Sequence, residues 1–124
     1  MQKYRNIQTE VFGHKFDSRK EAKHYLLLRA LEQKGEISNL RMQVPFELIP
    51  AVYKEEVVHL KTKDKVEKKC IQRATHYLAD FVYTDKGGNE IVIDVKSPIT
   101  RKNAEYRLKK KMMLAFKGIE IKEV

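Results

Sequence analysis

Two aspartates and one lysine within residues 77–96, YLADFVYTDKGGNEIVIDVK, have the types and spacing of a hydrolytic site. Asp80 lies in one strand-like run, and Asp94 and Lys96 lie in the next. Because successive strand residues point to opposite faces, Asp94 and Lys96 share a face. Paired carboxylates suit a hard cation such as Mg²⁺, and a nearby lysine can stabilise a developing phosphate anion or orient an attacking water. The stretch therefore predicts the outline of phosphodiester hydrolysis.

The apolar surroundings of both aspartates strengthen this interpretation. Asp80 sits in an apolar, aromatic run where aspartate is disfavoured, and Asp94 interrupts IVIDV, a run that looks buried on both faces. A carboxylate in such a strand is either buried with a partner or placed for chemistry. For Lys96, the alternatives are a solvated strand end or a simple ion pair with Asp94. If the first strand is regular, one of its faces carries four residues: His76, Leu78, Asp80 and Val82.

Several elements must position this hairpin, whose two runs are joined by a turn at residues 85–88. Ser18 and Glu21 have the spacing of a capping box that opens a helix over residues 19–34, and Gly35 suits the position after its end. The leucines of this helix spread widely round its axis, so we expect much of it to be buried. The remaining ranges predict a strand at 40–49 with Pro45 at an edge or bulge, a charge-dense hairpin at 51–60 and 65–72, strands at 74–83 and 90–96, a basic helix at 101–116 ended by Gly118, and a last strand at 119–124.

This order indicates an α/β fold. A strand–helix–strand unit at residues 90–124 implies a crossover connection, and therefore a mixed sheet with helices packed on it. The length of 124 residues suits one domain, residues 1–124, with a single core.

Composition favours a polyanionic partner in a reducing compartment. The formal net charge is +9 and the pI is near 9.6, which is typical of proteins that bind nucleic acid. The one cysteine, Cys70, allows no intrachain disulfide and is expected to be a packing residue rather than a nucleophile. The opening MQKYRNIQTE has no apolar core, and no apolar run is long enough to cross a bilayer, so we expect a soluble, intracellular protein with no membrane partner.

The residues quoted above, in this order, resemble the PD-(D/E)XK nuclease superfamily. Its core is αβββαβ, with a glutamate on the helix, an aspartate on the second strand and an acidic-x-Lys pattern on the third. The matching positions are Glu21, Asp80, Asp94 and Lys96, while Ala79 stands where the superfamily name has proline. More narrowly, the chain looks like a family of small phage-encoded proteins of unknown function in this superfamily. The stretches that fit are FDSRKEAKHY, QVPFELIP, HYLADFVYTD, DVKS and GIEIKEV, which span nearly the whole chain.

The resemblance implies a restriction-endonuclease-like fold to which the charged hairpin is an addition, and a DNA endonuclease that uses Mg²⁺, with Mn²⁺ as a substitute. Asp80, Asp94 and the Val95 carbonyl would hold the metal, and Glu21 would complete the site directly or through water. Lys96 would steady the attacking hydroxide. For Glu21, the alternative is a hydrogen bond to the Ser18 backbone as part of the capping box. Gln43 is a further candidate to project toward the site from the strand at 40–49.

The basic helix is the predicted DNA-binding element. Its packing residues are expected to be Tyr106, Leu108, Met112, Met113 and Phe116. Its cations would hold the phosphate backbone: Arg101, Lys102, Arg107, Lys109, Lys110 and Lys111. No sequence-reading helix is evident, so recognition is expected to depend on DNA structure.

The resemblance also suggests a role in phage DNA recombination, replication or packaging in the host cytoplasm. Resolvases of this superfamily are small, basic and dimeric, which makes branched DNA and a homodimer reasonable expectations, although no run of residues marks a dimer surface. Two alternatives stay open from sequence. One is a nucleic-acid-binding module that has the nuclease fold without cutting, and the other is an RNA-binding or protein-interaction domain.

Overall fold

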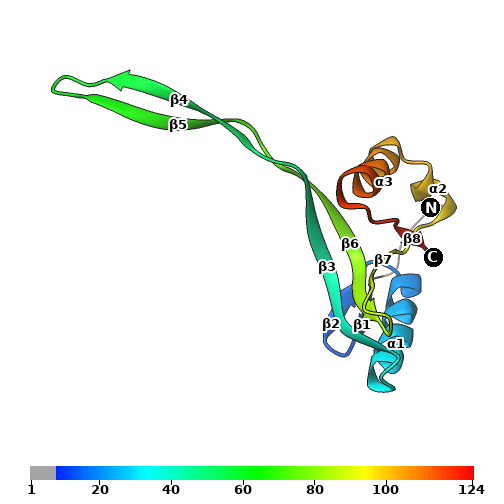
Figure 1. The fold of residues 1–124 in the computed structure, drawn as a ribbon. Helices are drawn as coiled ribbons and strands as arrows, with labels where there is room; N and C mark the ends of the chain where they lie inside the picture. The colour runs from blue at the N-terminus through cyan, green and yellow to red at the C-terminus, as the bar shows by residue number, and fades with distance from the viewer. Residues whose placement is uncertain (1–7) are drawn as a thin grey trace.

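A four-stranded mixed sheet lies at the centre of the molecule, which a computed structural model describes over residues 8–124. The strand order is β3 (Ile37–Ile49), β6 (Thr75–Asp85), β7 (Glu90–Asp94) and β8 (Lys122–Glu123). β3 pairs with β6, and β6 with β7, in the antiparallel direction, whereas β8 runs parallel to β7. The α/β class and the mixed sheet predicted from sequence are therefore confirmed (Figure 1).

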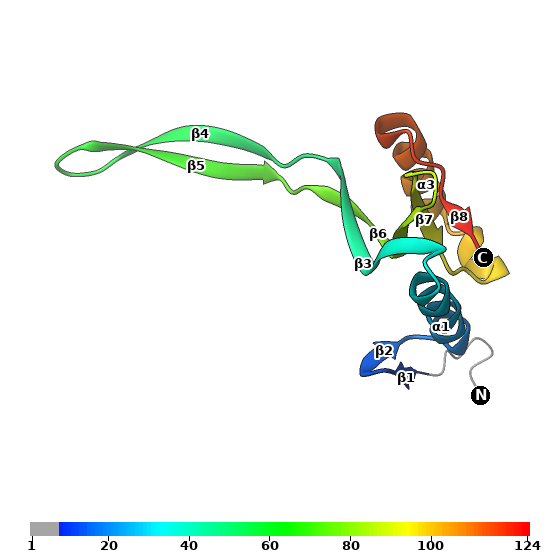
Figure 2. The ribbon, with the colours of Figure 1, turned by 60° about the horizontal axis from the view of Figure 1, so that its bottom comes forward.

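Helices cover the two faces of this sheet. In the described chain these are α1 (Arg19–Gln33), α2 (Pro98–Arg101) and α3 (Ala104–Lys117). Figure 2 shows α1 on one side of the sheet and α3 on the other. The core on the α3 side contains Leu48, Tyr77, Ala79, Val82, Val92, Tyr106, Met113 and Ile121. The core on the α1 side contains Phe16, Ala22, Tyr25, Leu28, Ile37, Phe81 and Ile93.

The first helix begins and ends where the sequence predicts but is less buried than expected. The Ser18 hydroxyl accepts the Glu21 backbone N–H at 3.2 Å, and Gly35 follows the helix with φ +79°. Only a narrow stripe faces the sheet, so the expected wide burial is wrong: Leu26 and Leu27 are 43% and 54% exposed. The reason is that α1 packs on one layer alone. Its buried residues are Glu21, Ala22, Tyr25 and Leu28.

The middle of β6 is irregular, which overturns the predicted face. Tyr77, Ala79 and Val82 pack on the α3 side, whereas Phe81 packs on the α1 side. Strict alternation fails between Ala79 and Val82, so Val82 does not share a face with Leu78, which is 54% exposed. The irregularity surrounds Asp80.

The predicted crossover between the last two strands is present, but it contains two helices instead of one. The basic stretch forms two helices rather than one, because Asn103 accepts the Tyr106 backbone N–H and caps a new helix. Gly118 ends α3 with φ +68°, as predicted. Two predicted packing residues of this helix, Leu108 and Phe116, are 53% and 62% exposed, so that expectation is wrong for both. The predicted strand over residues 90–96 ends at Asp94.

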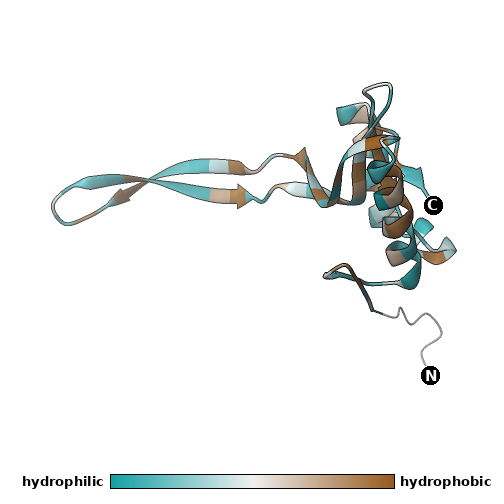
Figure 3. Ribbon diagram, turned by 90° about the horizontal axis from the view of Figure 1, so that it is seen from below, coloured by the Kyte–Doolittle hydropathy of each residue, from teal (hydrophilic) through white to brown (hydrophobic). Residues whose placement is uncertain are grey.

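Two antiparallel ribbons complete the structure. A short one pairs β1 (Thr9–Val11) with β2 (His14–Phe16). The predicted charged hairpin is confirmed as β4 (Val52–His59) and β5 (Asp64–Gln72), here called the arm, which extends far from the sheet (Figure 1 and Figure 2). Most of its residues are hydrophilic (Figure 3). Cys70 lies on the arm and is exposed, so its expected packing role is wrong.

Within residues 8–124, no helix is long and apolar enough to cross a membrane.

Candidate active site

The two predicted aspartates meet where β6 and β7 stop pairing. The last pair of that ladder is Phe81 with Ile93, and Asp80 and Asp94 come next on the two strands. Beyond this point the Val95 backbone N–H donates to the Asp80 carboxylate at 2.8 Å instead of to a strand neighbour. The side chain of Asp80 therefore takes the place of a ladder hydrogen bond, which ties the two carboxylate positions together.

Asp94 is a buried carboxylate whose hydrogen bonds are incomplete. Its side chain is 1% exposed, and its Oδ2 accepts the Tyr77 hydroxyl at 2.6 Å. Its Oδ1 is buried and accepts no hydrogen bond, although Lys96 Nζ is 3.3 Å away. Because buried polar atoms are normally satisfied, such an atom calls for an explanation. Hydrogen bonds therefore satisfy one oxygen of this carboxylate, and the other has only the Lys96 ammonium beside it.

Lys96 lies between the acids and α3. Its ammonium contacts Asp94 and stands over the Tyr106 ring, 4.7 Å from the ring centroid. Its backbone carbonyl accepts Lys20 Nζ at 3.1 Å, which ties the segment after β7 to the first turn of α1. The predicted proximity of Asp94 and Lys96 is thus present, although Lys96 is outside the strand.

Gln43 connects the glutamate of α1 to the aspartate of β6. Its Nε2 donates to Glu21 Oε1 at 3.1 Å and lies 3.5 Å from Asp80 Oδ1. Gln43 sits in β3 with φ +51°, a conformation that non-glycine residues rarely adopt. Its predicted projection toward the site is confirmed. Glu21 is buried, and the hydrogen bond described for its carboxylate comes from Gln43 rather than from the Ser18 backbone.

Burial, together with neighbouring acids, raises the pKa values of the acids in the site. Burial, followed by the neighbouring Asp94 carboxylate, raises the pKa of Asp80 to about 8, although the hydrogen bond from Val95 opposes this shift. Burial, followed by Asp17 and Asp94, also raises the pKa of Glu21. Burial and the hydrogen bond to Asp94 raise the pKa of the Tyr77 hydroxyl, which therefore stays a donor. Several carboxyl groups so close together are stable only if some are protonated or if a cation neutralises their charge.

A cavity of about 260 Å³ opens onto these groups. Glu21, Asp80, Val95 and Lys96 line it together with Lys20, and the rest of its wall comes from Asp17, Ser18, Ser97 and Thr100. It joins α1, the middle of β6 and the segment before α2. Four of the five predicted site residues therefore line one cavity, and the fifth, Asp94, lies buried beside it.

The residues present fit a hard divalent cation. Their donors are carboxylate oxygens and backbone carbonyls, which Mg²⁺ prefers, and the unsatisfied Asp94 Oδ1 is one of them. Among residues 8–124, no three His, Cys, Asp or Glu side chains are already close enough to form a metal centre. The fit therefore rests on donor chemistry and on the carboxylate oxygen that accepts no hydrogen bond.

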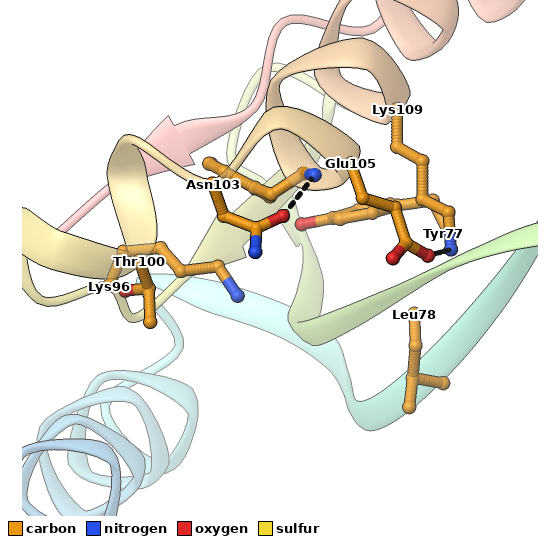
Figure 4. Close-up of a pocket in the computed structure, with 8 residues that line it drawn as sticks. Tyr77, Leu78, Lys96, Thr100, Asn103, Glu105 and Lys109 are labelled. Atoms are coloured by element: carbon orange, nitrogen blue, oxygen red, sulfur yellow. Dashed lines mark hydrogen bonds and ion pairs between the residues drawn. The ribbon is translucent and has the colours of Figure 1, made fainter.

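A second cavity, of about 320 Å³, adjoins the first on the α3 side (Figure 4). Lys96 and Thr100 line both cavities. In Figure 4, Lys109 of α3 reaches an ion pair with Glu105, at 3.1 Å. Of the six predicted DNA-binding cations, Lys109 thus lies near the candidate site but is paired, and Lys110 is bound to Glu123 at 2.6 Å. The other four are exposed: Arg101, Lys102, Arg107 and Lys111.

Two residues of the site were missed by sequence reasoning. Tyr77 has a detectable signal, because a hydroxyl-bearing aromatic precedes Asp80 by three residues in a buried run. The assumption of a regular strand placed it on the opposite face. Lys20 has no such signal, because its role depends on how α1 packs against the segment after β7.

The comparisons with known proteins give one family. A family described as "Protein of unknown function (DUF1064)" matches residues 1–123. No curated protein and no solved structure matches the chain significantly. The chain therefore belongs to the DUF1064 family.

Proposed function

We propose that this member of the DUF1064 family is a metal-dependent DNA endonuclease with a PD-(D/E)XK-type site. Asp94 carries the proposal: it is fully buried, has one unsatisfied carboxylate oxygen, and lies beside Asp80 and Lys96. Burying a second acid costs free energy unless a proton or cation offsets it. A metal ion would account for two neighbouring carboxylates of which one has an oxygen that accepts no hydrogen bond.

In this proposal Asp80, Asp94 and the Val95 carbonyl hold Mg²⁺, and Glu21 completes the site. The bound ion would lower the pKa of a water ligand and neutralise charge on the scissile phosphate. Tyr77 orients Asp94 through a hydrogen bond of 2.6 Å. Lys96, 3.3 Å from Asp94, places positive charge where the attacking hydroxide and the phosphate meet. Gln43 holds Glu21 and Asp80 in one orientation.

Cleavage by matched variants tests the proposal. Wild type, Asp94→Asn and Glu90→Gln would be incubated with a labelled four-way junction, a flap, a duplex and a single strand, in Mg²⁺, Mn²⁺ or EDTA. Asp94→Asn preserves side-chain volume but removes the charge, so cleavage should fall by at least about 100-fold while binding persists or improves. Glu90 is a surface acid of the same strand, 3.8 Å from Arg41, and its variant should cut like wild type.

The outcomes separate the proposal from its main alternative. Cutting only with divalent metal, and only by wild type and Glu90→Gln, supports the nuclease. Full activity in Asp94→Asn contradicts its assigned role. Salt-sensitive binding by all three proteins with no cutting under any condition would instead favour a nucleic-acid-binding module on a nuclease-like fold.

A further inference from the structure

The two faces of the arm differ in how their charges are paired. In an antiparallel ribbon, directly opposed residues share a face, and successive pairs alternate between faces. The first face carries Tyr53–Cys70, Glu55–Lys68, Val57–Val66 and His59–Asp64. The second, here called the charged face, carries Lys54–Lys69, Glu56–Glu67 and Val58–Lys65.

The first face is matched within one chain. Glu55 opposes Lys68, and the Lys68 ammonium also stands 4.7 Å from the centroid of the Tyr53 ring. Near the tip, His59 Nδ1 lies 2.8 Å from Asp64 Oδ1. Glu55 and Lys68 therefore oppose each other with opposite charges, and Asp64 has the His59 imidazole beside it.

The charged face places like charges directly opposite one another. Lys54 opposes Lys69, and Glu56 opposes Glu67, an arrangement that destabilises an isolated ribbon. All four side chains are exposed. Lys65 forms an ion pair with Glu67 at 3.8 Å. Among residues 8–124, no such ion pair is found for Lys54, Lys69 or Glu56. Along the face, positive and negative pairs follow each other two residues apart.

The arm also lacks any covering element. All of β5 is exposed, and in both ribbon views no helix or other strand lies against the arm (Figure 1 and Figure 2). A two-stranded ribbon alone is marginally stable in water. A long ribbon with opposed like charges therefore indicates a partner that supplies the missing charges in alternation.

The backbone of DNA does not match the alternating charges of this face, whereas the charged face of a second copy of the chain does. A phosphate backbone is uniformly negative, so the Glu56–Glu67 pair would repel it. Suppose that a second copy is related to the first by a two-fold axis that crosses the arm at the level of Glu55. The strands of the second copy then run in the opposite direction. The axis then sets each lysine pair over the partner's glutamate pair, because the two pairs are about 7 Å apart along the strand.

We propose that the charged face of the arm is a homodimer surface, on which a second copy docks its own charged face in the antiparallel direction. Lys54 then faces Glu56 of the partner subunit, and Lys69 faces Glu67 of the partner subunit. The contact is isologous and closed, so it stops at two copies. The two sheets and their candidate sites lie at opposite ends of the paired arms, and Tyr53 and Val57 stay outside the contact. This inference does not depend on nuclease activity.

Charge exchange tests the proposal without any DNA. Lys54→Glu with Lys69→Glu makes both opposed pairs acidic, and Glu56→Lys with Glu67→Lys makes both opposed pairs basic. Sedimentation velocity should show a dimer for wild type that dissociates as salt is raised, and monomers for each double variant. Mixing the two variants should restore a dimer, and native mass spectrometry should identify it as the mixed species. The control exchanges charges on the other face, Glu55→Lys with Lys68→Glu, and should stay dimeric.

Three results would overturn the proposal. A monomeric wild type at all concentrations tested, double variants that remain dimers, or a mixture that stays monomeric each contradicts the paired charged faces. Circular dichroism of each variant checks that the exposed substitutions leave the fold intact. A monomeric wild type whose affinity for duplex DNA is lost in the acidic variant would assign the arm to nucleic acid instead.

Discussion

Gln43 reaches the candidate site from a strained backbone. Its φ of +51° lies inside a strand, opposite the irregular part of β6, and directs its amide to Glu21 and Asp80. Such a conformation costs about 1–3 kcal/mol for a residue with a Cβ atom. The surrounding contacts must hold it in place, which is common where a site requires a particular side-chain direction.

Glycine should therefore be better tolerated than alanine at this position. Both Gln43→Gly and Gln43→Ala lose the amide, but only glycine relieves the positive φ, so Gln43→Gly should be more stable by about 1 kcal/mol. Urea unfolding measures the difference. Glu47, an exposed residue of the same strand, is the control, and there alanine should be the more stable of the two substitutions. The same order at both positions would argue against strain at Gln43.

Stability should fall with rising pH because Asp80 is protonated more readily in the fold. Its pKa is raised from 3.8 to about 8, so between these values the folded chain binds a proton that the unfolded chain has lost. In EDTA, the free energy of unfolding should decrease as the pH rises through this window, with a slope approaching about 1.4 kcal/mol per pH unit. Denaturant unfolding at several pH values measures it.

Asp80→Asn is the matched variant for this effect. It cannot ionise, so the decrease attributed to Asp80 should disappear, and the variant should exceed wild type in stability at pH 8. Addition of Mg²⁺ should make wild type less sensitive to pH, because the ion favours the ionised form. An unchanged slope in Asp80→Asn would assign the pH dependence to another group.

Residue types and spacing were enough to predict which charged groups would meet. Asp80, Asp94 and Lys96 could be grouped because a short turn links their runs and the strand period is two. Tyr77 could not be placed, because β6 departs from that period beside Asp80. An irregularity of this kind depends on packing against both helices, which no local pattern encodes.

At the scale of elements, Asn103 divides the basic segment. Its side chain accepts the Tyr106 backbone N–H at 3.0 Å, and its backbone is extended, so α3 begins there and α2 remains a single short helix. The sequence around it is rich in helix formers, which favoured one continuous helix. Only the competition between the capping side chain and the backbone reveals the break.

Removal of this cap should weaken α3. Asn103→Ala should lower the free energy of unfolding by about 1 kcal/mol, since one backbone donor of the first turn loses its acceptor. Asn103→Asp keeps an acceptor and places a negative charge at the helix start, so it should retain wild-type stability or exceed it. Thermal and urea unfolding of the three proteins decide this. Equal losses in both variants would show that the side chain matters for packing rather than for capping.

The other elements were predictable to different degrees. Turn and cap residues such as Ser18, Gly35 and Gly118 mark their ends correctly because the signals are local. The extent of burial was not predictable for α1, since its leucines are compatible with either one or two covering layers. The final strand is shorter than predicted: it is two residues long and pairs with Ile93 and Asp94 of β7.

At the scale of the whole molecule, the exposed cations of the last two helices should dominate DNA binding. Arg107 and Lys102 are exposed, whereas Lys109 and Lys110 are already paired with Glu105 and Glu123. Salt dependence of binding reports how many phosphates the protein neutralises. The paired lysines should therefore count for less than their charge suggests.

Neutralisation of these two groups of cations should give different salt slopes. Lys102→Gln with Arg107→Gln should reduce the slope of log K against log salt by about 0.9 per lost duplex phosphate contact. Lys109→Gln with Lys110→Gln should change it less. Fluorescence anisotropy with a labelled duplex between low and moderate salt measures both. Equal changes in the two double variants would contradict the distinction between exposed and paired cations.

The arrangement of the sheet was predictable only in outline. The crossover between β7 and β8 follows from a strand–helix–strand order, and it fixes their parallel pairing. The distance to which the arm extends was not predictable, because the sequence patterns of a covered hairpin and of a free one are the same when both faces carry charge.

The opposed like charges of the arm also bear on its solubility. Exposed ribbons with open edges are common starting points for fibrils, in which identical strands stack in register. In such a stack every Lys54 and Lys69 would meet its own copies, and so would every Glu56 and Glu67. The repulsion would repeat at each added chain. Charges that disfavour the ribbon locally thus protect an uncovered β-structure from unlimited growth.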